Sequence, residues 1–177
     1  MSKQIDEKIV YKGRRFTVTQ KRYINDNGVE YIRDIVNPGD AAIVLPVTEN
    51  EEVVFIKQFR ESVGKVAFEL PAGMIDEGEE PIHAAARELE EETGYRANRW
   101  ESLGYINTTP GICDEKLYLY FASELEFVGE HPDEGEIIKA QEYKLADVFE
   151  MIKNGEINDS KTICALSRAF FKGFLIW

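Results

Sequence analysis

The residues with the clearest chemical potential are three glutamates on one predicted helix. Segment 80–93 has apolar residues at helical spacing and is followed by Gly94, a residue type that commonly ends a helix. At 3.6 residues per turn, Glu88, Glu91 and Glu92 lie close together on one face. Clustered carboxylates repel one another, and a hard cation such as Mg²⁺, which binds oxygen ligands, would offset that repulsion. The spacing favours a cation site; the alternative is an ordinary solvated face.

The same helix belongs to a longer motif that begins before it. Gly73 is followed after five residues by Glu79, and after seven more by the run Arg87-Glu88-Leu89-Glu90-Glu91-Glu92-Thr93-Gly94-Tyr95. This pattern resembles the complete 23-residue Nudix box, a loop–helix–loop signature, at every fixed position. The resemblance implies an α/β fold, an α/β/α sandwich of mixed sheet. It also implies hydrolysis of a nucleoside diphosphate linked to another group.

The resemblance also implies a role for each matching residue. The expected metal ligands are three carboxylates and one backbone carbonyl, from Glu88, Glu91, Glu92 and Ala72. Arg87 would orient a glutamate through a charge-assisted pair, and is expected with Glu92 among the catalytic residues. Glu79 would support the loop or the metal waters; the alternative is an acid that is simply favourable near the helix N-terminus. Gly73 and Gly94 would permit tight turns on either side of the helix.

Hydrolysis also needs a general base, and the two histidines, His83 and His131, are poor candidates. Segment 130–136 is acidic and contains Pro and Gly. It resembles the acidic catalytic loop of bacterial ADP-ribose pyrophosphatases, a subgroup of the Nudix family. On that likeness Glu134 is the expected base and Glu136 an additional metal ligand, or the two roles are exchanged. The alternative is a solvated surface loop.

Residues outside the box bear on the substrate. Pro110, which lies 16 positions beyond Gly94 and is followed by Gly111 and Glu115, resembles the ADP-ribose pyrophosphatase pattern; the alternative is a simple β-turn. Segment 56–60 resembles the same subgroup. The expected substrate contacts are Pro110, Gly111 and Glu115, Arg60 and Arg33 on phosphate or the terminal ribose, and Phe16 on the base. Phe16 is equally well explained as a core aromatic residue.

The remaining elements predict a small β module, residues 1–38, before a hydrolase domain, residues 39–177. The Asn-Gly pair at 27–28 separates two alternating runs, which predicts an antiparallel hairpin. On the box helix, a stripe of apolar and small residues is expected to face the sheet, namely Ile82, Ala85, Ala86, Leu89 and Thr93. Further strands are expected at 41–47, 52–58, 66–70, 100–106, 116–122 and 137–143, and helices at 145–153 and 160–174.

Composition limits the possible partners. The net charge of −12 disfavours nucleic acid, and no apolar run reaches 18 residues, so no membrane span is expected. The polar start of the chain lacks a signal peptide, which indicates a cytoplasmic protein. Cys113 and Cys164 match no metal spacing. The resemblance further implies a homodimer that exchanges the β module.

Together these features predict Mg²⁺-dependent hydrolysis, with Mn²⁺ as a possible substitute, of a nucleoside diphosphate sugar. The best candidate reaction converts ADP-ribose to AMP and ribose 5-phosphate. The alternatives are GDP-mannose or another nucleotide sugar, a nucleoside triphosphate, and a non-catalytic nucleotide sensor. Pro110 argues against the triphosphatase, and the intact set of Glu88, Glu91 and Glu92 argues against the sensor.

Overall fold

Two groups of residues form separate sets of contacts in the structure, a computed structural model of the 177-residue chain. Unit 1 comprises Met1–Asp40 and Ile106–Leu117, and unit 2 comprises Ala41–Tyr105 and Tyr118–Trp177. The structure describes residues 1–129 and 139–176. Two sequence-predicted site residues, Glu134 and Glu136, therefore lie outside the described residues.

Unit 1 contains a three-stranded antiparallel sheet with the order β1-β2-β3. Its strands are β1 (Lys3–Lys12), β2 (Thr17–Ile24) and β3 (Glu30–Asn37). The predicted hairpin is confirmed as β2–β3, and its turn is closed by Gly28 N–H donating to the Asn25 carbonyl at 2.9 Å. Strand β1 was not predicted, because its sequence is mostly polar and all ten of its residues are exposed.

Unit 2 contains two sheets, with the strand orders β10-β5-β6 and β7-β4-β9-β8. Strands β8 and β9 each have one end in unit 1. The strands are β4 (Ala41–Pro46), β5 (Glu52–Arg60), β6 (Lys65–Glu69), β7 (Ala72–Met74), β8 (Tyr95–Asn107), β9 (Lys116–Phe127) and β10 (Lys139–Lys144). The helices are α1 (Pro81–Thr93), α2 (Leu145–Lys153) and α3 (Ser160–Phe171).

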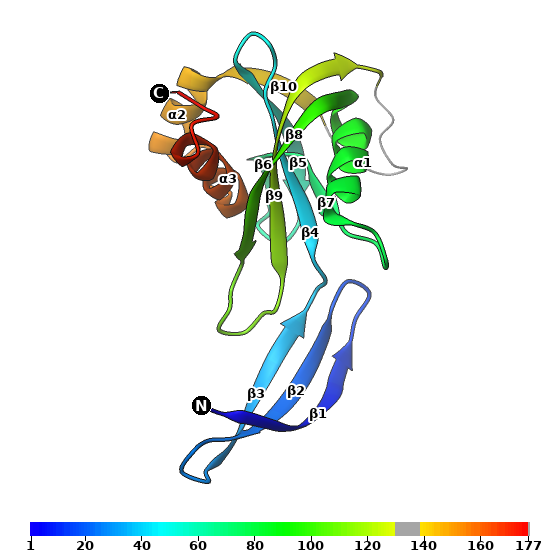
Figure 1. The fold of residues 1–177 in the computed structure, drawn as a ribbon, viewed down its shortest axis with the longest axis vertical. Coiled ribbons are helices and arrows are strands. Elements are labelled where there is room, and N and C mark those ends of the chain that lie inside the picture. The colour runs from blue at the N-terminus through cyan, green and yellow to red at the C-terminus, as the bar shows by residue number, and fades with distance from the viewer. Residues whose placement is uncertain (130–138, 177) are drawn as a thin grey trace. The chain divides into compact units, whose positions relative to one another are not determined.

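The strands of unit 2 lie between α1 on one side and α2 and α3 on the other (Figure 1). All six residues of β4 are buried, and the strand packs against both α1 and α3. This double burial explains why its sequence is a continuous apolar run. The expected α/β architecture is confirmed. In the part of the chain that the structure describes, no helix is long and apolar enough to cross a membrane.

Helix α1 begins at Pro81, one residue after the predicted start, and ends at Thr93 as predicted. Pro81 occupies the first turn, where its missing N–H is tolerated, and Gly94 closes the helix with a left-handed φ of 72°. The expected buried stripe is partly wrong, because Ala86 is exposed and Ala84 is buried instead. Ala84 packs against β4 in the core, and this rotation of the helix also buries Glu92.

Candidate active site

Strand β7 lies directly beneath a glutamate of α1. A Cβ atom added to Gly73 would be 1.9 Å from Oε1 and 2.0 Å from Cδ of Glu88. Gly73 does not have a left-handed φ, so the expected role in a tight turn is wrong for this residue. Because Gly73 has no side chain, the Glu88 carboxylate can occupy the space in which a Cβ atom would lie. Glycine is therefore required at position 73 by close approach.

Glu92, about one turn after Glu88 in α1, contacts the same strand. The backbone N–H of Ala72 donates to Oε2 of Glu92 at 2.8 Å, and Glu92 is only 9% exposed. Burial of a carboxylate is unfavourable unless its oxygens find donors, and this backbone N–H is one such donor. Residues 72–73 thus contact both Glu92 and Glu88.

Arg87 forms hydrogen bonds with three glutamates of the motif. Its Nη1 donates to Oε1 of Glu88 at 2.6 Å and to Oε2 of Glu91 at 3.1 Å, and its Nη2 donates to Oε2 of Glu79 at 3.3 Å. The hydrogen bond with Glu79 is the main reason that the pKa of Arg87 is raised, and it also lowers the pKa of Glu79. Glu79 accepts a further bond from the N–H of Asp76. The structure thus pairs Arg87 with three glutamates and links Glu79 to the backbone of the loop, while the catalytic roles of these residues stay predictions.

The chemistry of these groups fits a hard divalent cation. Carboxylates of Glu88, Glu91 and Glu92 line one side of α1 beside the backbone of β7, and oxygen ligands are those that Mg²⁺ prefers. Among residues 1–129 and 139–176, no three acidic, histidine or cysteine side chains converge as a complete ligand set. Two of the carboxylates point to Arg87 instead. The metal ligand set therefore stays a prediction.

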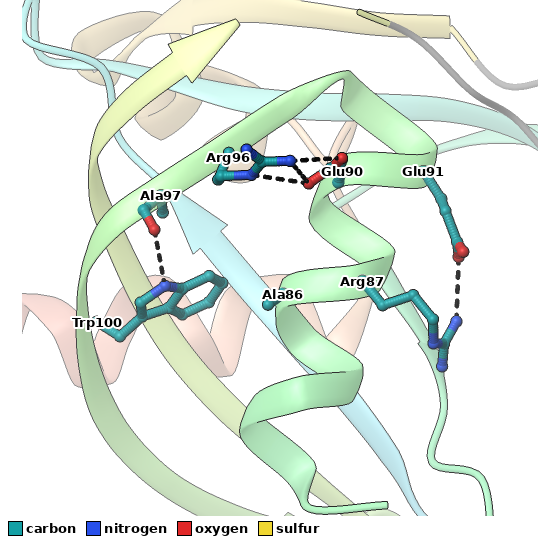
Figure 2. A pocket seen from close by; sticks show the side chains of 7 residues that line it. All are labelled: Ala86, Arg87, Glu90, Glu91, Arg96, Ala97 and Trp100. Carbon is teal, nitrogen blue, oxygen red and sulfur yellow. Dashed lines mark hydrogen bonds and ion pairs between the residues drawn. The ribbon is translucent and has the colours of Figure 1, made fainter. Parts of the chain in front are cut away.

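The fourth glutamate of the run, Glu90, points elsewhere. Figure 2 shows the Arg87–Glu91 pair on one side of α1, and Glu90 with Arg96 on the other. Arg96 Nη2 donates to Glu90 at 2.9 Å, beside a cleft of about 640 Å³ that Trp100 also lines. Glu90 is thus paired away from the other glutamates of the run.

Arg60, the predicted phosphate contact of β5, is fixed by a residue that the sequence did not indicate. It donates from Nε and Nη2 to the two oxygens of Glu69 at 2.8 and 2.6 Å, a bidentate pair. Glu69 is 4% exposed and also accepts a bond from Lys161. The hydrogen bond with Glu69 raises the pKa of Arg60, and the charge of Glu92 contributes to the same shift. The charges of Arg60 and of Glu92 on α1 therefore interact.

Helix α3 supports this region from its first turn. Asp159 caps the helix by accepting from the N–H of Thr162 at 3.0 Å. The hydroxyl of Thr162 accepts from the N–H of Leu70 at 3.0 Å, and Lys161 contacts Glu69. Sequence reasoning missed these supporting residues. The Asp before the helix signalled a cap, but nothing local signalled contacts between residues 92 positions apart.

The other expected substrate contacts belong to unit 1. Arg33 is exposed on β3 and lies over the ring of Tyr31, 4.6 Å from its centroid. Phe16 is 41% exposed, so its reading as a core aromatic is wrong. Pro110 and Gly111 are exposed in a turn closed by Ile112 N–H to Thr109 O at 3.0 Å, while Glu115 is half-buried. Their contacts with substrate stay predictions.

Comparison with known proteins agrees with this geometry. Residues 37–166 match the NUDIX domain. The chain is 35% identical to an ADP-ribose pyrophosphatase of Bacillus subtilis (strain 168), over 93% of this chain and 92% of that protein. It is 30% identical to an ADP-ribose pyrophosphatase of Mycobacterium tuberculosis, over 92% and 80%. A crystal structure of an ADP compounds hydrolase shares the fold, with a TM-score of 0.85, 23% identity and coverage of 98% and 97%.

Proposed function

The chain belongs to the NUDIX family of hydrolases, and from this premise we propose that it hydrolyses ADP-ribose to AMP and ribose 5-phosphate with Mg²⁺. The relatives named as ADP-ribose pyrophosphatases support a nucleoside diphosphate sugar as the substrate class. ADP-ribose is the member of that class whose hydrolysis those names describe. Mn²⁺ is a suitable substitute because it also takes oxygen ligands.

One observation supports this proposal above the others. Residues 69–73 join the two parts that cleavage of a diphosphate requires. At one end, Glu69 holds Arg60, a cation suited to phosphate; at the other, Ala72 and Gly73 contact Glu92 and Glu88. A single short segment therefore contacts both Arg60, the proposed phosphate contact, and two glutamates of α1.

The residues divide the chemical work as follows. Glu88, Glu91, Glu92 and the carbonyl of Ala72 would hold the divalent ion, which neutralises phosphate charge and lowers the pKa of a bound water. Arg60 would bind the diphosphate oxygens. The expected contact of Arg33 with phosphate stays a prediction. Water would then attack one phosphorus atom of the diphosphate, and the bond between that phosphorus and the bridging oxygen would break. The displaced phosphate group would keep the bridging oxygen. The base that accepts the proton from water is proposed to be Glu134, with Glu136 as its alternative or as an additional metal ligand.

A substrate panel tests this function. The purified enzyme with Mg²⁺ is given ADP-ribose, GDP-mannose, UDP-glucose, diadenosine polyphosphates and 8-oxo-dGTP, and the products are separated by anion-exchange chromatography. We expect the highest kcat/KM with ADP-ribose, and AMP and ribose 5-phosphate in equal amounts. A preference for 8-oxo-dGTP would contradict the nucleotide-sugar assignment, a preference for GDP-mannose would change the sugar nucleotide, and no turnover of any compound would favour a sensor.

We further propose a cytoplasmic homodimer that uses unit 1 as an interface. Strand β1 exposes several apolar side chains, with Ile9 64% and Tyr11 52% exposed. Exposed apolar side chains on one element are typical of a surface that binds a partner, and a second copy of the chain would cover them. Light scattering after gel filtration should give about twice the monomer mass of 20.3 kDa. A monomeric mass at micromolar concentration would contradict the dimer.

A further inference from the structure

Glu69 is held by two cations from different elements. Arg60 on β5 donates to both of its oxygens, at 2.8 and 2.6 Å, and the ammonium of Lys161 on α3 contacts the same carboxylate. Lys161 Nζ also lies 3.0 Å from Oδ2 of Asp159. The side chains of Glu69 and Lys161 are 5% and 13% exposed, whereas that of Arg60 is 34% exposed. Arg60 is therefore the cation of this cluster that a ligand reaches most easily.

Arg60 borders a cleft of about 580 Å³ between the β5–β6 hairpin and the first turn of α3. Lys65 and Lys161 line the same cleft, and so does Glu69. A diphosphate that approaches Arg60 here also approaches the carboxylate of Glu69. An uncompensated anion at that position would repel the substrate, because charge interactions are strong where little water is present.

Lys161 removes this conflict. The guanidinium of Arg60 has five N–H donors, of which the Nε and one Nη2 hydrogen point to Glu69, so it can hold Glu69 and a phosphate oxygen together. The single positive charge of Arg60 would then be shared between Glu69 and the phosphate. Burial tends to raise the pKa of Glu69, but the bond from Arg60 and the charge of Lys161 lower it to about 2. Glu69 thus stays ionised, and its second cation leaves Arg60 available.

We propose that Lys161 is a positioning residue for substrate binding, which neutralises Glu69 so that Glu69 can orient Arg60 toward the diphosphate. Lys161 acts through Glu69 and Arg60. The proposal rests on the proposed function, since that function gives Arg60 a phosphate to bind. The hydrogen bond from Leu70 to Thr162 fixes α3 next to Glu69, which keeps Lys161 in place.

A double-mutant cycle tests this role with steady-state kinetics on the best substrate of the panel. We expect Lys161→Met to raise KM about tenfold while kcat changes less than about twofold, because an interaction made equally in ground state and transition state is lost. Lys161→Arg should restore most of the affinity. In an Arg60→Gln background, Lys161→Met should raise KM no further, because the residue through which Lys161 acts is gone.

The controls separate positioning from general stability. Lys153→Met removes an exposed lysine that pairs with Glu150 on α2, and it should leave KM and kcat unchanged. Thermal unfolding is followed for every variant. If Lys161→Met does not fold, Lys161→Gln replaces it in the same cycle with Arg60→Gln, since it also removes the ammonium charge that neutralises Glu69.

The outcomes are distinguishable. Additive effects of Lys161→Met and Arg60→Gln on KM, or a loss of kcat at constant KM, would overturn the positioning role while the proposed function stands. A wild-type enzyme that hydrolyses no compound of the panel would overturn the proposed function, and the role of Lys161 with it.

Discussion

Replacement of Gly73 by alanine should disable the active site without unfolding the protein. The added methyl group would be 1.9 Å from Oε1 of Glu88, and no side chain can occupy that space while the carboxylate remains there. The clashing atoms are the far end of a flexible side chain, so the carboxylate can swing away. The backbone at Gly73 is outside the left-handed region and accepts alanine without strain.

The size of the displacement sets the expected effects. Moving Oε1 from 1.9 Å to an ordinary contact at 3.4 Å requires a shift of about 1.5 Å, which breaks the 2.6 Å bond from Arg87 to Glu88. Loss of such a partly exposed ion pair costs about 1 kcal/mol, and replacing glycine in a compatible conformation returns about 0.4–1 kcal/mol. Tm should therefore fall by less than about 4 °C. A displaced metal ligand should lower metal affinity by about 100-fold or more.

Gly78→Ala is the matched control. Gly78 lies in the turn between β7 and α1, where a Cβ meets nothing within 4 Å, and its φ of 81° is left-handed. Alanine at position 78 should cost about 1–2 kcal/mol through backbone strain and leave activity unchanged. The two variants thus separate stability from function. Circular dichroism gives Tm, calorimetric titration with Mn²⁺ gives metal affinity, and ADP-ribose hydrolysis gives kcat/KM.

Two results would refute this reasoning. If Gly73→Ala keeps wild-type metal affinity and kcat/KM, the carboxylate of Glu88 is not needed where the structure places it. If Gly73→Ala unfolds while Gly78→Ala does not, the clash is carried by backbone that cannot move, and the explanation from side-chain displacement is wrong.

Three further predictions follow from the same contacts. Glu92→Gln keeps an oxygen for the N–H of Ala72, so the fold should be retained while kcat falls by about 100-fold or more; near-normal turnover would exclude Glu92 as a ligand. Gly94→Ala places Cβ 2.8 Å from the backbone carbon of Gly129 at a φ of 72°, and should destabilise the fold by more than about 2 kcal/mol in urea unfolding; unchanged stability would contradict the packing. Because folding lowers the pKa of Glu69 from 4.5 to about 2, its stabilisation is complete above pH ~5 and lost as pH falls toward 2. Glu69→Gln should therefore unfold with a weaker dependence on pH in that window, and an identical dependence would refute the assignment.

Local sequence patterns predicted helices and strands well where residues close together in the sequence determine the boundaries of the element. The box helix was predicted at 80–93 and found at Pro81–Thr93, because Pro81 and Gly94 act through their own backbone geometry. The helix at 145–153 was found with those bounds. Strand β1 was missed because its sequence lacks the apolar alternation by which a strand is recognised.

The supporting contacts of the site could not be predicted in the same way. Glu69 and Lys161 are separated by 92 positions in the sequence. Each alone looks like an ordinary charged surface residue, in a chain of which 31% of the residues are charged. The orientation of α1 was also misjudged, because Ala84 and Ala86 are equally small and only packing against β4 decides which of them is buried. Tertiary contacts therefore determined what composition and periodicity left open.

The hydrogen bond from Leu70 to Thr162 has a consequence for the order in which the enzyme becomes competent. During synthesis the segment 69–73 emerges from the ribosome well before α3, since Leu70 and Thr162 are 92 positions apart. Until α3 emerges, the nascent protein carries its whole glutamate motif but lacks the clamp on Glu69 and Arg60. Helix α3 thus completes the contacts of Glu69, and a truncation that ends before Asp159 should leave a chain that contains the signature of the family but binds the proposed substrate poorly.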